Sequence, residues 1–307
     1  MDLSVVVPTL NGRDRLAASL DSLAARAPGA EVVVVNGPSA DGTTGMVRER
    51  DDVDVLVEIA DRCINVARNA GTAVASGDAI ALLGFDLRIA EGWADAIRDG
   101  LAAASAVSGP ISHGERGDSA TEPERRTIAG REVTYFSGDN VAFRAATLRH
   151  TLDGFDEYLA VGGARDAAHR LAGAGNEVAW LDSMAATRSE DAAPGGPQPH
   201  GPDEHDRSWK YRSLSYRLTK NYGPRPTVAR RTLSHAAADA ADAARAVLGG
   251  DGTPTSWFSN GRGVVTGMAR GSADGLTARA RDRTPARNPN GLSLERERAV
   301  AVYDWRK

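Results

Sequence analysis

The chain has 307 residues, of which 41% are hydrophobic and 25% are charged, so its composition is that of a folded globular protein rather than a disordered one. Its formal net charge of −4 does not favour a nucleic-acid-binding protein, and we expect no nucleic-acid partner. The single cysteine, Cys63, excludes an internal disulfide framework and a cysteine-based zinc cluster. No apolar run approaches the ~18 residues that a transmembrane helix needs.

Short apolar runs alternate with amphipathic segments along the first half of the chain. Four runs rich in Val, Ile and Leu predict buried strands: residues 3–7, 31–35, 53–57 and 79–83. Leucines at 16, 20 and 23 predict a helix after the first strand, and further helices are expected from about Thr43 and over 65–75. This alternation predicts an α/β fold with a mainly parallel sheet covered on both faces.

The second half has a more mixed pattern. Strands and short helices are expected over residues 131–136, 144–150, 166–174 and 177–181. A Pro/Gly-rich stretch changes the composition before a basic and aromatic region begins. We therefore predict an α/β domain over 1–190, a linker over 191–206 and a mostly helical, basic C-terminal extension over 207–307.

Ligands of open parallel sheets bind beyond the carboxyl ends of the strands. Three polar or Gly-rich loops follow predicted strands at that edge: residues 8–12, 36–42 and 84–88. These loops are where we expect the functional site.

Seven motifs in and after these loops resemble, in order, those of an inverting family-2 glycosyltransferase with the GT-A fold. They are VVVPTLNG (5–12), VNGPSADGT (35–43), NVARNAG (65–71), GDAIALLGFD (77–86), AEGW (90–93), SGDNVAFR (137–144) and GFDE (154–157). The resemblance covers about residues 3–185. It implies a Rossmann-like domain that binds a nucleotide-sugar donor.

The resemblance also implies which residues hold the nucleotide. Pro8, Thr9, Asn11 and Asn36 are expected to line the uracil and ribose pocket, with Asn36 standing where an acidic residue is usual. Turn chemistry after a strand is the alternative explanation of Pro8 and Asn11. Arg68 is expected to contact the diphosphate, because a guanidinium donates two hydrogen bonds to phosphate; a solvated helix arginine is the equal alternative.

Family members bind Mg²⁺ or Mn²⁺ through an Asp-x-Asp motif after the fourth strand. Here that segment is Gly84-Phe85-Asp86, so the first Asp is missing. The resemblance implies that Asp86 holds the metal and contacts the donor, and one carboxylate with phosphate oxygens can suffice for Mg²⁺. The alternative is that Asp86 only caps a turn.

An inverting transfer needs a general base that takes the proton from the acceptor hydroxyl. The family's acidic pair falls here on Gly163 and Ala164. Asp166 is the nearest carboxylate and is our predicted catalytic base, with Asp139 and Asp156 in reserve. The alternative is that Asp166 caps the following helix.

The C-terminal segments resemble a narrower group, the haloarchaeal family members that elongate lipid-linked glycans for S-layer N-glycosylation. The segments are residues 209–214, 220–223, 288–293 and 299–304. This resemblance implies transfer of a hexose or hexuronic acid, from a donor expected to be UDP-linked, to a dolichol-phosphate-linked (polyprenyl) oligosaccharide. It also implies a peripheral place at the cytoplasmic face of the cell membrane, or in the cytoplasm.

The basic extension has two explanations. Its outer face contacts an anionic membrane surface, or its helices cap the sheet with solvated arginines. Two other functions stay open for the whole chain. One is a catalytically silent relative that binds a nucleotide sugar or a partner transferase, and the other is a nucleotidyltransferase on a similar sheet.

Overall fold

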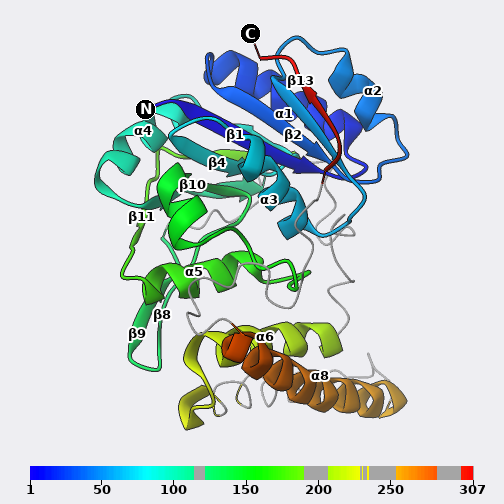
Figure 1. The fold of residues 1–307 in the computed structure, drawn as a ribbon, viewed down its shortest axis with the longest axis vertical. Helices are drawn as coiled ribbons and strands as arrows, with labels where there is room; N and C mark the ends of the chain where they lie inside the picture. Colours follow the sequence, from blue (N-terminus) through cyan, green and yellow to red (C-terminus); the bar gives the residue numbers. More distant parts are fainter. Residues whose placement is uncertain are drawn as a thin grey trace.

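The computed structural model describes residues 1–113, 122–189, 207–228, 230, 234, 254–281 and 299–306. A central sheet with helices packed on both faces forms the larger part, and two long helices lie side by side below it (Figure 1). The predicted linker over 191–206 and the Ala-rich segment 236–248 lie outside the described residues. Among the helices that are described, none is both long enough and apolar enough to cross a bilayer.

Strands and helices alternate through the first hundred residues, as the apolar runs predict. The elements are β1 (Leu3–Thr9), α1 (Arg13–Arg26), β2 (Glu31–Asn36), α2 (Thr43–Arg48), β3 (Val55–Ile59), α3 (Ile64–Val74), β4 (Ala79–Leu83), β5 (Leu87–Ile89) and α4 (Trp93–Ala103). Strand β3 lies two residues further along the chain than the predicted strand over 53–57.

The second half is built from shorter strands. They and the remaining helices are β6 (Ala106–Ser108), β7 (Ile111–His113), β8 (Arg125–Ile128), β9 (Arg131–Thr134), β10 (Asn140–Arg144), the π-helical turn η2 (Thr147–Thr151), α5 (Gly163–Gly173), β11 (Val178–Trp180), β12 (Ala186–Arg188), α6 (Arg207–Tyr222), α8 (Pro254–Arg281) and β13 (Ala299–Asp304). Strands β6, β7, β8, β10, β12 and β13 have no counterpart among the predicted strands.

The main sheet has the strand order β11-β6-β10-β4-β1-β2-β3-β13. Strands β4, β1, β2 and β3 are parallel, whereas β10 runs antiparallel between β4 and β6. A three-stranded sheet, β5-β12-β7, lies beside it, and β8 pairs with β9. The predicted mainly parallel α/β sheet is confirmed.

Successive side chains of the central strands enter two separate cores, because a strand alternates faces. Val6, Val33 and Leu82 pack under α3 and α5, while Val5, Val34 and Leu83 pack under α1 and α4. Helix α3 lies very close to the sheet: a Cβ added at Gly71 would lie 2.3 Å from Val6 Cγ1. The helices are thereby fixed over the strands whose ends carry the polar loops.

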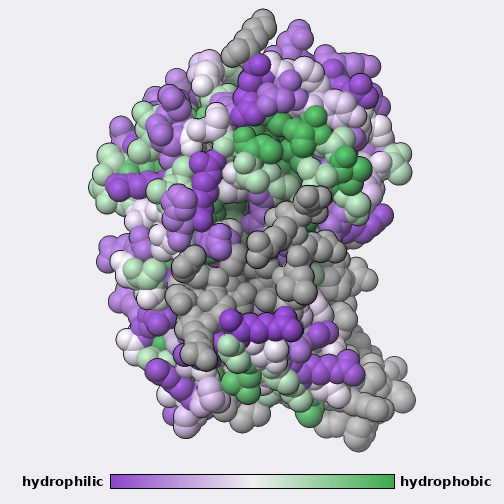
Figure 2. Space-filling view, viewed as in Figure 1, coloured by the Kyte–Doolittle hydropathy of each residue, from purple (hydrophilic) through white to green (hydrophobic). Residues whose placement is uncertain are grey.

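The C-terminal part, predicted to be mostly helical over 207–307, contains the long helices α6 and α8 and also one strand that was not predicted. Strand β13 returns to the main sheet and pairs antiparallel with the edge strand β3, from Ala299 beside Ile59 to Asp304 beside Val55. Its apolar side chains Val300 and Val302 are exposed, and hydrophobic surface gathers on the same side of the molecule in Figure 2. The end of the chain is therefore part of the α/β sheet.

Helices α6 and α8 pack with their backbones almost in contact. Glycines recur every fourth residue on α8, and a Cβ at Gly267 or Gly271 would lie 2.2 or 2.1 Å from the carbonyl oxygens of Ser208 and Arg212 on α6. Only glycine permits this approach. Helix α6 also contacts α5, so the helical pair is joined to the α/β domain.

Candidate active site

The loops after β1, β2 and β4 meet at one edge of the sheet, as the sequence predicts. Thr9 pairs with Asn36 at the ends of β1 and β2, and Gly37 N donates to Thr9 O at 2.9 Å. A Cβ added at Gly12 would lie 2.4 Å from the ring of Phe85, so the segment after β4 packs against the loop after β1. The polar residues of the three loops therefore share one region.

Asn11 and Asn36 shape the loop between β2 and α2. Asn11 has φ 51°, a left-handed conformation that asparagine tolerates, and its Oδ1 accepts from Ala40 N at 2.8 Å. Ser39 Oγ donates to Asn36 Oδ1 at 2.7 Å, and Asn36 Nδ2 donates to Thr44 Oγ1. These bonds fit the turn-chemistry alternative, and nucleotide contact by the two asparagines stays a prediction.

Pro8 and Thr9 lie inside the end of β1. Pro8 is paired with Val35 of β2, and both Pro8 and Thr9 are buried. Thr9 Oγ1 has no hydrogen-bond partner among the residues that the structure describes. A buried hydroxyl without a partner is unusual and leaves one polar atom for a bound ligand.

Arg68 is buried on α3 and held by three groups. Nη2 donates to Asp139 Oδ1 at 3.1 Å, Nη1 donates to Asn65 Oδ1 at 3.3 Å, and the guanidinium lies over the ring of Phe155. A Cβ at Gly138 would lie 2.5 Å from Nη2, so the glycine makes room for the guanidinium. Burial lowers the pKa of Arg68 despite the opposing charge of Asp139. The solvated-arginine alternative is wrong, while diphosphate contact stays a prediction.

Asp86 lies within a group of four charges, which we call the edge cluster: Asp86, Asp139, Arg68 and Arg188. Arg188 Nη1 donates to Asp86 Oδ2, and its Nη2 donates to Asp139 Oδ2 at 3.3 Å. Burial would lower the pKa of Arg188, but the two carboxylates outweigh it and raise the pKa. The cluster therefore holds two stable cations against two carboxylates at the end of β4.

A divalent cation does not fit this arrangement. The guanidinium of Arg188 already binds both carboxylates of the edge cluster, Asp86 and Asp139. Within the described ranges, no three His, Cys, Asp or Glu side chains are grouped to hold a metal ion. The prediction that Asp86 binds Mg²⁺ or Mn²⁺ therefore has no support from the surrounding side chains.

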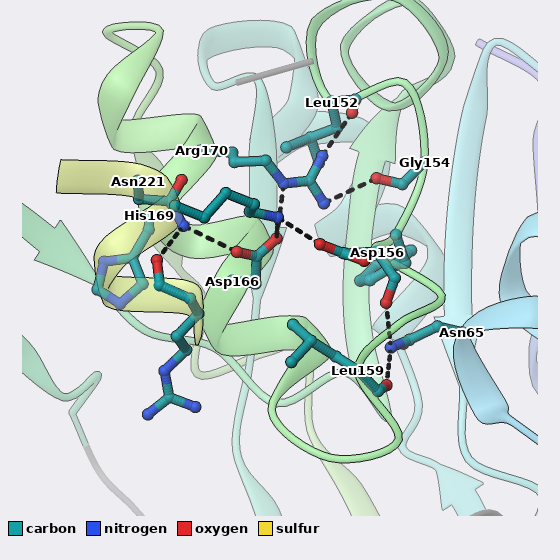
Figure 3. Close-up of polar contacts among 12 residues, drawn as sticks. Asn65, Leu152, Gly154, Asp156, Leu159, Asp166, His169, Arg170 and Asn221 are labelled. Atoms are coloured by element: carbon teal, nitrogen blue, oxygen red, sulfur yellow. Dashed lines mark hydrogen bonds and ion pairs between the residues drawn. The ribbon is translucent and has the colours of Figure 1, made fainter. Parts of the chain in front are cut away.

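Asp166 belongs to a second group of four charges, the buried cluster: Asp156, Asp166, Arg170 and Lys220 (Figure 3). Arg170 Nε and Lys220 Nζ donate to Asp166 Oδ2 at 2.8 and 2.9 Å, and Asn221 Nδ2 donates to Oδ1 at 2.8 Å. Lys220 Nζ also donates to Asp156 Oδ2 at 2.5 Å. All four side chains of the cluster are fully buried.

These contacts do not suit the predicted role of Asp166 as general base. Burial alone would raise its pKa, but Lys220 and Arg170 lower it to about 2, so the carboxylate is a weak proton acceptor. Asp166 lies in the first turn of α5 and not at its cap, because the helix begins at Gly163. A structural role is the better description, and catalysis by Asp166 stays a prediction.

Gly163, the first of the two residues on which the acidic pair of the family falls, is closely packed. A Cβ at Gly163 would lie 2.3 Å from Nδ2 of Asn65, whose amide fills the space beside the start of α5. Asn65 Nδ2 donates to the carbonyl oxygens of Asp156 and Leu159 at 3.0 and 2.6 Å. An acidic side chain at 163 would displace this amide.

Two residues of the site were not expected from the sequence, Arg188 and Asn65. Arg188 lies on β12, a strand of three residues whose short pattern gives no signal. Asn65 is the first residue of the NVARNAG motif, but nothing in the motif shows that its amide joins the two clusters. Only the pairing of distant segments reveals either role.

Comparisons with known proteins give the family model and the solved structures to which the chain is similar. Residues 4–151 match the family model described as Glycosyl transferase family 2, and no curated protein matches the chain. The chain is similar to TarS from S. aureus, with 19% identity and a TM-score of 0.55 over 72% of this chain and 39% of TarS, so it spans about two fifths of TarS. It is also similar to TarS 1–349 in complex with UDP-GlcNAc, with 18% identity and a TM-score of 0.54 over 72% of this chain and 68% of the other.

A third solved structure covers more of the chain. The mannosyltransferase PcManGT from Pyrobaculum calidifontis, in complex with GDP-Man and Mn²⁺, has 19% identity and a TM-score of 0.53 over 89% of this chain and 86% of its own. At these identities the structural likeness shows the fold alone. The expected GT-A fold is thereby confirmed.

Proposed function

We propose that the protein is an inverting hexosyltransferase that uses a nucleotide-sugar donor, because residues 4–151 match the glycosyltransferase family 2 model. The proposal rests on one observation. The loops after β1, β2 and β4 lie beside the edge cluster, so neutral polar groups and cations are close together. The neutral loops suit a nucleoside, and the cations suit its diphosphate. Solved structures of similar fold contain UDP-GlcNAc and GDP-Man, which supports this donor class.

The reaction is a single displacement at the anomeric carbon. The acceptor hydroxyl oxygen forms a bond to that carbon while the bond to the diphosphate oxygen breaks, and the configuration inverts. The nucleoside diphosphate leaves with the bonding electrons, and a base takes the hydroxyl proton. Asp139 is our candidate base, because 28% of its side chain is exposed whereas Asp156 and Asp166 are fully buried.

The donor is proposed to be UDP-linked, and the acceptor a dolichol-phosphate-linked oligosaccharide of protein N-glycosylation. Support for a lipid-linked acceptor comes from α8, on which the apolar residues Val265 and Leu276 and the basic residues Arg270 and Arg281 are all exposed. Hydrophilic and hydrophobic residues are interspersed over α6 and α8 in Figure 2. Such a surface suits peripheral contact with an anionic membrane, the place we propose for the protein.

A catalytically silent protein that binds a nucleotide sugar is the second candidate. Gly163 and Ala164 favour it, because they replace the acidic pair from which the family draws its base. The two functions differ in turnover and share donor binding.

A donor panel separates them. Purified protein is mixed with UDP- and GDP-linked hexoses and hexuronic acids and with a polyprenyl-phosphate-linked glycan in vesicles, and nucleoside diphosphate release and the anomeric configuration of the product are measured. We expect transfer from a UDP-linked donor with inversion. Binding of a donor without transfer from any of them would support the silent protein.

The Asp139→Asn variant tests the base. We expect transfer to fall by about 10²- to 10⁴-fold while UDP binding is retained, as for the loss of a general base. Asp182→Asn, a change at an exposed carboxylate far along the chain from the loops, is the control and should transfer at the wild-type rate. Full activity of Asp139→Asn would remove Asp139 from the mechanism.

A further inference from the structure

The edge cluster contains a built-in cation beside the incomplete metal motif. We infer that Arg188, together with Arg68, supplies the positive charge that binds the donor's diphosphate, in place of a divalent cation. The inference rests on the proposed function, because it assigns the diphosphate part of the same donor site.

Arg188 is fixed by the small sheet and is not a free surface side chain. Strand β12 pairs antiparallel with β5, which places Arg188 beside Leu87, and Ser189 N donates to Asp86 O at 3.0 Å. The side chain of Asp86 is only 8% exposed, and its Oδ2 is bound by Arg188. The cation is therefore placed by backbone pairing at the residue from which a metal would have been held.

The cluster has donors to spare for phosphate oxygens. The hydrogen bonds of Arg188 to Asp86 and Asp139 use two of the five N–H groups of a guanidinium, and 22% of its side chain is exposed. Within the described part of the chain, Arg68 Nε and Ser189 Oγ are buried without a hydrogen-bond partner. Buried polar atoms of this kind are expected to meet a ligand or water.

Gly84 and Arg188 form one combined departure from the metal-binding pattern. A Cβ added at Gly84 would lie 3.1 Å from Asp139 Cβ and 3.3 Å from Asp86 Oδ1, so a side chain at 84 would press on both carboxylates. In place of a carboxylate at 84, the turn before β10 brings Asp139 to the cluster, and Arg188 binds it together with Asp86. The two carboxylates that Arg188 binds thus lie close to the position of the missing Asp.

The charges of the edge cluster balance before a donor arrives, with two carboxylates and two guanidinium groups. The diphosphate brings further negative charge and competes with the carboxylates for the guanidinium donors, which suit its oxygens in a bidentate way. The cations then stabilise the leaving nucleoside diphosphate.

Calorimetric titration with UDP and with uridine, in excess EDTA and in Mn²⁺, tests the inference on the full chain. Wild-type affinity for UDP should change by less than roughly 3-fold between EDTA and Mn²⁺. Arg188→Ala should weaken UDP binding in EDTA by about 10- to 100-fold and leave uridine binding unchanged, since a charged hydrogen-bonding group is lost. Mn²⁺ should partly restore UDP binding to this variant, because Asp86 and Asp139 are released to hold it.

Arg98→Ala is the matched control, because Arg98 is a surface arginine of α4 paired only with Asp95 in the contacts described. It should bind UDP like the wild type under both conditions. Arg188→Lys keeps the charge without the fork and should bind UDP with intermediate affinity. Melting temperatures show which variants are folded, and Arg188→Lys and Arg188→Gln replace Arg188→Ala if that variant does not fold.

Loss of wild-type UDP binding in EDTA, or unchanged UDP affinity in Arg188→Ala, would overturn the inference while the proposed function stands. Failure of the wild type to bind either UDP or GDP under both conditions would overturn the proposed function and the inference together. If Arg188→Ala binds UDP more weakly and Mn²⁺ does not restore the binding, Arg188 does not stand in for a divalent cation. That result would also overturn the inference.

Discussion

The edge cluster and the buried cluster each contain two carboxylates and two cations, yet their surroundings give them different uses. In the buried cluster every side chain is inaccessible to solvent, and α6 supplies Lys220 to carboxylates from the α/β domain. In the edge cluster, Asp139 and Arg188 are partly exposed and donors remain unused. The two clusters therefore have the same charges but different roles. Burial and the number of unused hydrogen-bond donors determine whether a cluster can bind a ligand.

A single amide joins the two clusters. Asn65 Oδ1 accepts from Arg68 of the edge cluster, and its Nδ2 donates to the carbonyl oxygen of Asp156 in the buried cluster. Helix α6, through Lys220, thus holds the loop around Asp156, and this loop holds Asn65. The buried cluster acts as the support on which the position of Arg68 depends.

The largest effect is expected from breaking the buried cluster. Lys220→Met leaves an uncompensated negative charge in the interior, which should lower the free energy of unfolding by about 3–5 kcal/mol. Urea denaturation measures it. Lys210→Met, at an exposed position on the same helix, is the control and should stay within about 0.5 kcal/mol of the wild type. Equal stability of the two variants would mean that the buried charges are not coupled to α6.

A smaller effect, on activity and not on folding, is expected at the edge cluster. In Gly138→Ala the new Cβ meets the end of the Arg68 side chain, which can move at little cost to stability. The displaced guanidinium should reduce transfer by about 10- to 100-fold, as a misplacement of about 1 Å can. Steady-state transfer rates measure the effect on activity, and the urea midpoint measures the effect on stability.

Gly45→Ala is the control for that variant, because a Cβ at Gly45 on α2 meets nothing within 4 Å. It should keep full activity and gain up to about 1 kcal/mol of stability from helix propensity. Wild-type rates in Gly138→Ala would show that the position of Arg68 is not critical.

Much of the fold could be predicted because the central strands are buried on both faces. Their apolar runs at 3–7, 31–35 and 79–83 mark β1, β2 and β4 within two residues, and the leucine spacing marks α1. Strands β10, β12 and β13 were missed because they are short or mixed in character and form only by pairing with distant segments. The return of β13 to β3 joins residues 240 to 249 positions apart, which no local pattern can show.

Part of the candidate site could also be predicted from the sequence, and part could not. Asp86, Arg68 and the loops at 8–12 and 36–42 could be placed together, since the ends of parallel strands share one edge. Arg188 could not, because its role depends on the register of β12 against β5. Asp166 is the carboxylate nearest in sequence to the family's acidic pair, but its i,i+4 contact with Arg170 and its contact with Lys220 of α6 bury it.

The smallest expected effect, a difference in acid stability, sharpens the comparison within the buried cluster. The pKa of Asp166 is about 2 in the folded chain against an ordinary 3.8, so its stabilisation is present above pH 3.8 and is lost as the pH falls toward 2. Burial raises the pKa of Asp156, although Lys220 opposes the rise, so this carboxyl contributes with the opposite sign. Asp166→Asn should therefore lose less stability than the wild type between pH 4 and pH 2, and Asp156→Asn should lose more. The urea midpoint of each protein is measured at each pH. The other carboxylates are the same in all three proteins, so their effects cancel in the differences between variant and wild type. Parallel plots of midpoint against pH for the three proteins would show that Lys220 does not distinguish Asp156 from Asp166.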